Sequence, residues 1–153
     1  MSTRSAQFAP LVEPSLTLRR RLNATPAKIF RAWTQPAQFM TWMHPGGSDV
    51  IRAEFDVRAR GNYTIVFRKP DGGVVEVSGT YLEVVPERKL VFTWMPRGGS
   101  EHESQVTILL EPEQNANATW LTLTHERFAD DAQRDDHRHG WTDGIDSLER
   151  YLL

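Results

Sequence analysis

Cysteine is absent from this sequence of 153 residues. Without thiols the chain can form neither disulfides nor thiolate metal sites, and it has no cysteine nucleophile. Long apolar runs are absent too, and none approaches the roughly 20 residues that a membrane-spanning helix needs. The first ten residues lack the apolar centre of a signal peptide, so we expect a cytoplasmic protein with no integral membrane contact.

An excess of either charge is also missing, since 18 basic residues stand against 20 acidic ones and the net charge is −2. Proteins that bind the phosphate backbone usually cluster Lys and Arg on one face. Arg19–Arg21 is a short basic run within a predicted strand, where edge protection or surface ion pairing is the simpler explanation. We therefore expect no nucleic-acid partner.

Aromatic residues, by contrast, are plentiful: the chain has five Trp, seven Phe and three Tyr. Large rings bury roughly 150–250 Å² each wherever they sit, so they are well suited to filling a core. Rings are also stiff, and several of them together leave gaps that a flat ligand could occupy. Both readings, core and pocket, stay open from composition alone.

The first part of the chain predicts a strand and two short helices. Residues 15–22 alternate in polarity, as a half-buried strand does. Thr25-Pro26 then predicts a helix start, because Thr caps the first turn and Pro fits its first position. A second short helix begins at Pro36 and is stopped by Pro45-Gly46-Gly47.

After Gly47 the pattern changes to a period of two, which is typical of strands joined by short turns. Asp130 then predicts the N-cap of a long amphipathic helix, with Gln133 three residues on. We read residues 1–14 as a flexible arm and 15–153 as a single α+β domain, with Pro96–Ser100 as a loop. The predicted strands cover 50–55, 61–68, 74–85, 89–95, 103–111 and 118–128.

Three segments resemble a known family: TPAKIFRAWTQPAQFMTW (25–42), VSGTYLEVVPERKLVFTW (77–94) and GWTDGIDSLERYL (140–152). The chain resembles the START-like (SRPBCC) helix-grip superfamily and, within it, the homologues of the heat shock protein 90 ATPase activator. The resemblance implies a curved antiparallel sheet of about seven strands wrapped on a long C-terminal helix. It also implies a mostly apolar cavity between them, used in the superfamily for lipids, hormones, polyketides or other hydrophobic molecules.

The candidate ligand-binding residues are those that the pattern and the implied fold turn inward toward this cavity. They are Trp42, Tyr63, Phe67, Tyr81, Phe92, Trp94, His125, His137, Trp141 and Ile145, with Ile65 and Leu123 beside them. The alternative is that these residues only fill the core. Trp33 is expected in the core beneath the first helix, and Trp120 on the outer face of the sheet.

Catalytic patterns are weak in this sequence. His125, His137 or Glu103 could act as acid or base, but no catalytic set is assigned. Arg134 could clamp a ligand carboxylate, or pair with a neighbouring Asp. His137 and His139 are two apart on a helix and do not converge, so no metal is expected, and no motif implies a cofactor.

Three functions follow from these observations. The leading prediction is a soluble protein that binds a small hydrophobic or aromatic molecule between the sheet and the C-terminal helix. The alternatives are an enzyme of cyclase, hydratase or hydrolase type using the same cavity, and a chaperone-interacting module like the activator that gives the family its name. A homodimer that pairs through the outward-facing Trp120 and Val66 is a further hypothesis.

Overall fold

The computed structural model describes residues 13–97 and 102–153. Its strands form a seven-stranded antiparallel sheet in the order β1-β7-β6-β5-β4-β3-β2, so that successive strands from β2 to β7 are neighbours and β1 joins at β7. The strands are β1 (Leu16–Leu22), β2 (Asp49–Phe55), β3 (Asn62–Arg68), β4 (Val74–Val85), β5 (Lys89–Arg97), β6 (Ser104–Pro112) and β7 (Thr119–Glu126).

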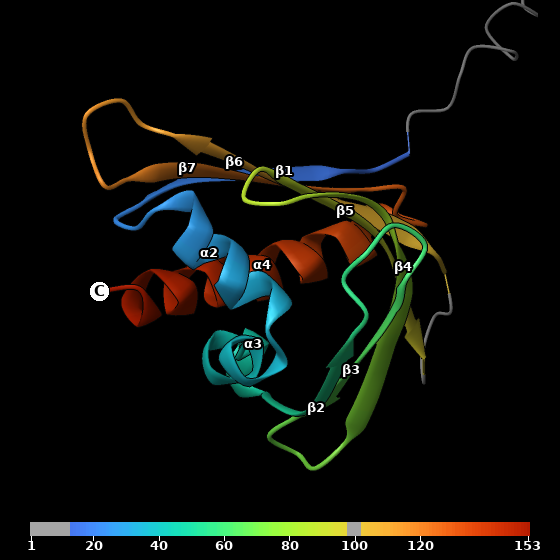
Figure 1. Cartoon of the computed structure of the whole chain (residues 1–153). Coiled ribbons are helices and arrows are strands. Elements are labelled where there is room, and N and C mark those ends of the chain that lie inside the picture. The colour runs from blue at the N-terminus through green and yellow to red at the C-terminus, as the bar shows by residue number, and fades with distance from the viewer. Residues whose placement is uncertain (1–12, 98–101) are drawn as a thin grey trace, which may run out of the picture.

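The helices lie on the concave side of this sheet. They are α2 (Pro26–Thr34), α3 (Pro36–Trp42), the short 3₁₀ turn η1 (Pro45–Gly47) and the long α4 (Asp131–Tyr151). Figure 1 shows the sheet bending around α4, with α2 and α3 closing the side away from the strands. The predicted α+β helix-grip fold is thus confirmed, with two short helices after the first strand and one long helix at the end.

The two predicted helix caps, Thr25 and Asp130, are both formed. The side chain of Thr25 accepts a hydrogen bond from the backbone N–H of Lys28 (3.3 Å), and Pro26 follows it. The side chain of Asp130 accepts from the backbone N–H of Gln133 (2.9 Å). Each bond satisfies one N–H that the first helical turn leaves without a partner.

The loop predicted from Pro96 begins too early, because β5 continues through Arg97. Pro96 pairs with Val77 of β4, whereas the pairing with β6 on the other side starts only at Trp94 and Ser104. Beyond Trp94 the strand therefore has one neighbour among the described residues. An edge position of this kind tolerates proline, which has no N–H to donate.

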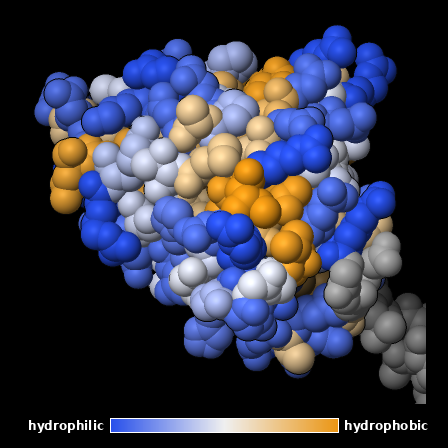
Figure 2. Space-filling view, turned by 90° about the horizontal axis from the view of Figure 1, so that it is seen from below, coloured by the Kyte–Doolittle hydropathy of each residue, from blue (hydrophilic) through white to orange (hydrophobic). Residues whose placement is uncertain are grey.

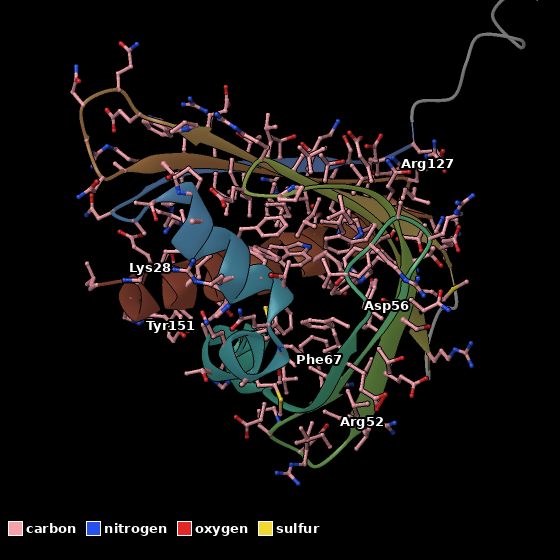
Figure 3. The ribbon with its side chains drawn as sticks, viewed as in Figure 1. Lys28, Arg52, Asp56, Phe67, Arg127 and Tyr151 are labelled. Carbon is pink, nitrogen blue, oxygen red and sulfur yellow. The ribbon has the colours of Figure 1, made fainter. Side chains whose placement is uncertain are left out.

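Alternation along β6 and β7 builds the core. Val106, Ile108, Leu121 and Leu123 are at most 1% exposed, while the residues between them are only partly buried. Figure 3 shows Phe67 on the inner side of β3 and Arg52 of β2 pointing outward. The inner face of the sheet therefore carries the apolar side chains, as the period-two pattern predicts.

Helix α4 completes this core through one stripe of its surface. Trp141, Gly144, Ile145 and Leu148 are buried on it. A Cβ on Gly144 would lie 3.2 Å from the Met43 sulfur, so this glycine allows the close approach of the chain after α3. None of the helices in the described ranges is long and apolar enough to cross a membrane.

The basic run on β1 pairs with neighbouring side chains on the surface. Arg20 bridges to α4 through Asp146 (2.8 Å) and Glu149 (2.7 Å). The guanidinium of Arg19 lies 4.0 Å from the ring centre of Trp120, on the outer face of the sheet. Both contacts support the prediction of surface pairing, and Trp120 lies outward as expected.

The side of the molecule seen from below in Figure 2 is mostly hydrophilic, with a group of hydrophobic side chains near its centre and smaller ones at its left and upper edges. The predicted arm falls largely on residues 1–12, which lie outside the described residues. At its end, the carbonyl of Pro14 accepts a hydrogen bond from the backbone N–H of Phe128 (3.2 Å).

Candidate functional site

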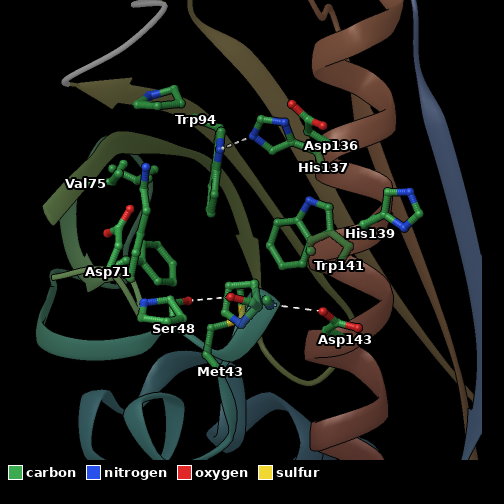
Figure 4. A pocket seen from close by; sticks show the side chains of 18 residues that line it. Met43, Ser48, Asp71, Val75, Trp94, Asp136, His137, His139, Trp141 and Asp143 are labelled. Atoms are coloured by element: carbon green, nitrogen blue, oxygen red, sulfur yellow. Dashed lines mark hydrogen bonds between the residues drawn. The ribbon is translucent and has the colours of Figure 1, made fainter. Parts of the chain in front are cut away.

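A cavity of about 700 Å³ opens between the N-terminal half of α4, the strands β3 to β5 and the segment after α3. Figure 4 shows α4 on one side of it and the β3–β4 turn on the other. Its walls are made by Met43, Pro45, Gly46, Ser48, Phe67, Lys69, Pro70, Asp71, Val75, Val77, Trp94, Pro96, Asp136, His137, His139, Gly140, Trp141 and Asp143.

Local periodicity places these walls. Val75 and Val77 are two apart on β4 and share its inner face, and Trp94 lies on the inner face of β5. On α4, His137 and Trp141 are four apart and therefore point to the same side. The inner walls are thus apolar and largely aromatic.

The rim of the cavity is charged. Its exposed ionisable side chains are those of Lys69, Asp71, Asp136, His139 and Asp143. Asp143 also accepts a hydrogen bond from the backbone N–H of Gly46 (3.0 Å), which ties η1 to α4 at the rim. A mostly apolar cavity with a few polar or charged groups is the usual composition of a small-molecule site.

A second, much smaller cavity of about 20 Å³ lies deeper in the core. Trp94 and Trp141 contribute to the walls of both cavities, and their ring centres are 5.2 Å apart. The remaining walls of the inner cavity are Trp33, Phe39, Phe55, Tyr63, Ile65, Tyr81, Leu90 and Phe92. The paired indoles are therefore the floor of the large cavity.

Two histidines accept hydrogen bonds from this floor: His137, which itself lines the large cavity, and His125, which lies behind the floor. The indole Nε1–H of Trp94 donates to Nε2 of His137 (3.2 Å), and that of Trp141 donates to Nδ1 of His125 (2.9 Å). The two imidazole centres are 5.0 Å apart. Two aromatic wall residues and two histidines thus form one contiguous group.

The partners determine which ring nitrogen carries the proton. An indole N–H only donates, so Nδ1 of His125 is bare, and its Nε2–H donates to the Ser104 hydroxyl (2.6 Å). That hydroxyl in turn lies 3.3 Å from the carbonyl of Trp94 and donates to it. In His137 the proton is on Nδ1, because this nitrogen faces the carbonyl of Gln133 (2.8 Å) and must donate to it, and Nε2 is the acceptor.

Burial keeps both imidazoles neutral. His125 is fully buried, and burial, helped by the neighbouring His137, lowers its pKa from 6.5 to about 2. The pKa of His137 is also lowered by burial, while its bond to Gln133 and the nearby Asp136 act in the opposite direction. A neutral imidazole has one nitrogen that can accept a hydrogen bond from an indole N–H, whereas a charged imidazolium has none.

The sequence-predicted residues separate into three groups. Phe67, Trp94, His137 and Trp141 line the large cavity. Tyr63, Tyr81 and Phe92 line the small one, together with the two shared indoles.

Trp42, His125 and Ile145 line neither cavity and are buried in the core. The Trp42 indole, for example, donates to the carbonyl of Ala32 (2.8 Å). Trp42 was predicted beside Trp94 and Trp141, but Trp33 occupies that place, 4.9 Å from Trp42 and 5.9 Å from Trp141 between ring centres.

The prediction also omitted several wall residues. Val75 and Val77 carried a usable signal, since they alternate on a predicted strand in register with inward residues. Met43 and Ser48 carried none, because they follow α3 in irregular chain whose direction only the fold defines.

The other chemistry-bearing candidates lie away from the cavity. Glu103 is exposed just before β6. Arg134 is paired with Asp135 (3.0 Å) and Asp131 (3.5 Å). Within residues 13–97 and 102–153, no three His, Cys, Asp or Glu side chains gather closely enough to hold a metal ion.

Comparison with known proteins gives a consistent match. The model of the family described as Activator of Hsp90 ATPase homolog 1-like protein matches residues 23–153. A solved structure from Chromobacterium violaceum is 25% identical with a TM-score of 0.82, covering 90% of this chain and 96% of that one. The AHSA1 protein from Silicibacter pomeroyi is 26% identical with a TM-score of 0.78, covering 91% and 97%. No curated protein matches the sequence.

Proposed function

We propose that this chain binds a small hydrophobic or aromatic molecule. The chain belongs to the family of Activator of Hsp90 ATPase homolog 1-like proteins and has their START-like helix-grip fold. The binding site is the cavity between α4 and β3–β5. One observation carries this function: a cavity of about 700 Å³ with apolar inner walls and a charged rim. Small-molecule sites of roughly 300–1,000 Å³ have this composition.

The preformed shape of the walls supports binding. Trp94 and Trp141 are at most 5% exposed, and each indole is fixed by a hydrogen bond to a histidine. Rings held in place lose little rotamer freedom when a ligand arrives, so less of the binding free energy is spent on ordering them. A flat ligand can stack on such rings without rearranging the core.

The same hydrogen bonds favour binding over proton transfer. A general acid or base has to reach the ligand with a free nitrogen or oxygen. Both nitrogens of His125 and both of His137 are already bonded to protein atoms.

The test uses N-phenyl-1-naphthylamine, a neutral aromatic probe whose emission rises in apolar surroundings. We expect saturable binding of one probe per chain, with energy transfer from tryptophan to the probe. Val75→Trp narrows the cavity from its β4 wall and should weaken this binding. Val74→Trp is the matched control, because Val74 is the neighbouring residue, is 58% exposed and lines neither cavity.

If the probe and a broad panel of lipids and aromatic acids fail to bind the folded protein, the proposed function is wrong. Equal binding of the probe by Val75→Trp and Val74→Trp would place the probe outside this cavity and would also contradict the proposed function.

A further inference from the structure

The cavity floor has ring surfaces but no spare hydrogen-bond donor. An indole contributes a single donor, Nε1–H. The donor of Trp94 is bound to His137, and the donor of Trp141 is bound to His125. A ligand that rests on these indoles therefore meets carbon atoms and the faces of the rings.

The histidines offer no substitute, because their remaining nitrogens are bonded elsewhere. His137 donates through Nδ1 to the carbonyl of Gln133, one turn earlier on α4. His125 donates through Nε2 to Ser104, whose hydroxyl donates to the carbonyl of Trp94. Each series of hydrogen bonds thus begins at a wall indole and ends on a backbone carbonyl of the protein itself.

The opposite wall is apolar as well. Figure 4 shows Val75 on this wall, and Phe67 and Val77, which lie beside it on paired strands, also line the cavity; all three carry only hydrocarbon side chains. A polar group pressed between this wall and the indoles would lose its water and gain no partner. An unsatisfied buried polar group costs enough to lower affinity roughly 10-fold or more.

Building on the ligand-binding function proposed above, we propose that His125 and His137 are positioning residues that accept the hydrogen bonds of the floor's indole N–H groups. The cavity therefore selects ligands whose inserted end is an aromatic or aliphatic group without hydrogen-bonding atoms. Polar groups of the ligand then lie at the charged rim. The ligand class is an amphiphile with a flat apolar end.

The test compares two ligands that differ only at the inserted end: 4-(biphenyl-4-yl)butylamine and its 4′-hydroxy analogue. The ammonium group of both stays in water at the rim, since burying a charge is costly and three Asp side chains lie there. The biphenyl group enters, and the hydroxyl, where present, meets the floor. Affinities are measured by displacement of N-phenyl-1-naphthylamine and by calorimetry.

In the natural protein we expect the hydroxy analogue to bind roughly 10-fold more weakly than its parent. His137→Ala frees the Trp94 N–H at the floor, where the hydroxyl can accept its hydrogen bond. The preference should then shrink to roughly 3-fold or less. Adding Trp94→Phe to His137→Ala removes the freed donor and should restore the preference, which a merely structural effect of His137 would not do.

Arg138→Ala is the control, because Arg138 is exposed on the same helix and lines neither cavity. Its preference for the parent ligand should equal that of the natural protein. Circular dichroism and urea unfolding verify that each variant folds. If His137→Ala does not fold, the difference in affinity between the two ligands for the natural protein still decides the question.

Equal or tighter binding of the hydroxy analogue to the natural protein overturns the inference while leaving ligand binding itself intact. An unchanged preference in folded His137→Ala overturns it as well. If neither ligand binds and the fluorescent probe is not bound either, the proposed function fails and takes this inference with it.

Discussion

The buried His125 makes a quantitative prediction about stability in acid. Its folded-state pKa is lowered from 6.5 to about 2 because the ring is fully buried. Below pH 6.5 the unfolded chain therefore takes up a proton on this residue and the folded chain does not. The free energy of unfolding falls as the pH falls through this window, since protons bind the unfolded state more strongly.

The magnitude follows from the width of the window. Each pH unit between the two pKa values changes the free energy of unfolding by about 1.4 kcal/mol. Lowering the pH from 7.5 to 4.5 crosses about two such units below 6.5, so this one histidine destabilises the fold by about 3 kcal/mol. Small domains have roughly 5–15 kcal/mol in total, so the loss is easily measured.

The assay is urea unfolding at several pH values for the natural protein and for His125→Gln. The glutamine amide does not titrate, yet it retains an acceptor and a donor for Trp141 and Ser104. The rest of the sequence is the same in both proteins, so the difference between their pH profiles reports on position 125. The stability advantage of the natural protein should shrink by about 3 kcal/mol on acidification, and a pH-independent difference would refute the reasoning.

Three further substitutions test the fold. Gly79→Ala places a Cβ against the carbonyl oxygen of Thr93 on the adjacent strand and should lower the free energy of unfolding, measured with urea, by about 3 kcal/mol. A decrease of less than about 1 kcal/mol would contradict this close approach. Thr25→Ala removes the cap of α2 and should cost about 1 kcal/mol, with no change if the cap is absent in solution. Arg20→Ala breaks two partly exposed ion pairs and should cost at most about 1 kcal/mol, less in high salt; a larger or salt-independent loss would contradict surface pairing.

Elements with a strong local signal were predictable from sequence. The strands alternate in polarity, and Thr25 and Asp130 cap their helices as their residue types predict. The end of β5 was not predictable, because proline at position 96 is tolerated only where β6 no longer pairs with the strand.

The site was predictable only in part, since a sequence shows which residues point inward but not what each one faces. Trp94 and Trp141 were expected at one cavity, and both line it. Trp42 and Trp33 lie on consecutive short helices, and which of them reaches Trp141 depends on the angle at Gln35–Pro36. The bonds of His125 and His137 join α4 to β5 and β7 and have no local signal.

The most direct test of the ligand-binding cavity uses the indole N–H signals of the five tryptophans in a ¹⁵N–¹H spectrum. Titration with N-phenyl-1-naphthylamine should shift the signals of Trp94 and Trp141, which line the large cavity. The signal of Trp120, on the outer face of the sheet beneath Arg19, should stay in place. Shifts at Trp120 with none at Trp94 and Trp141, or no shifts at saturating probe, would contradict the proposed site.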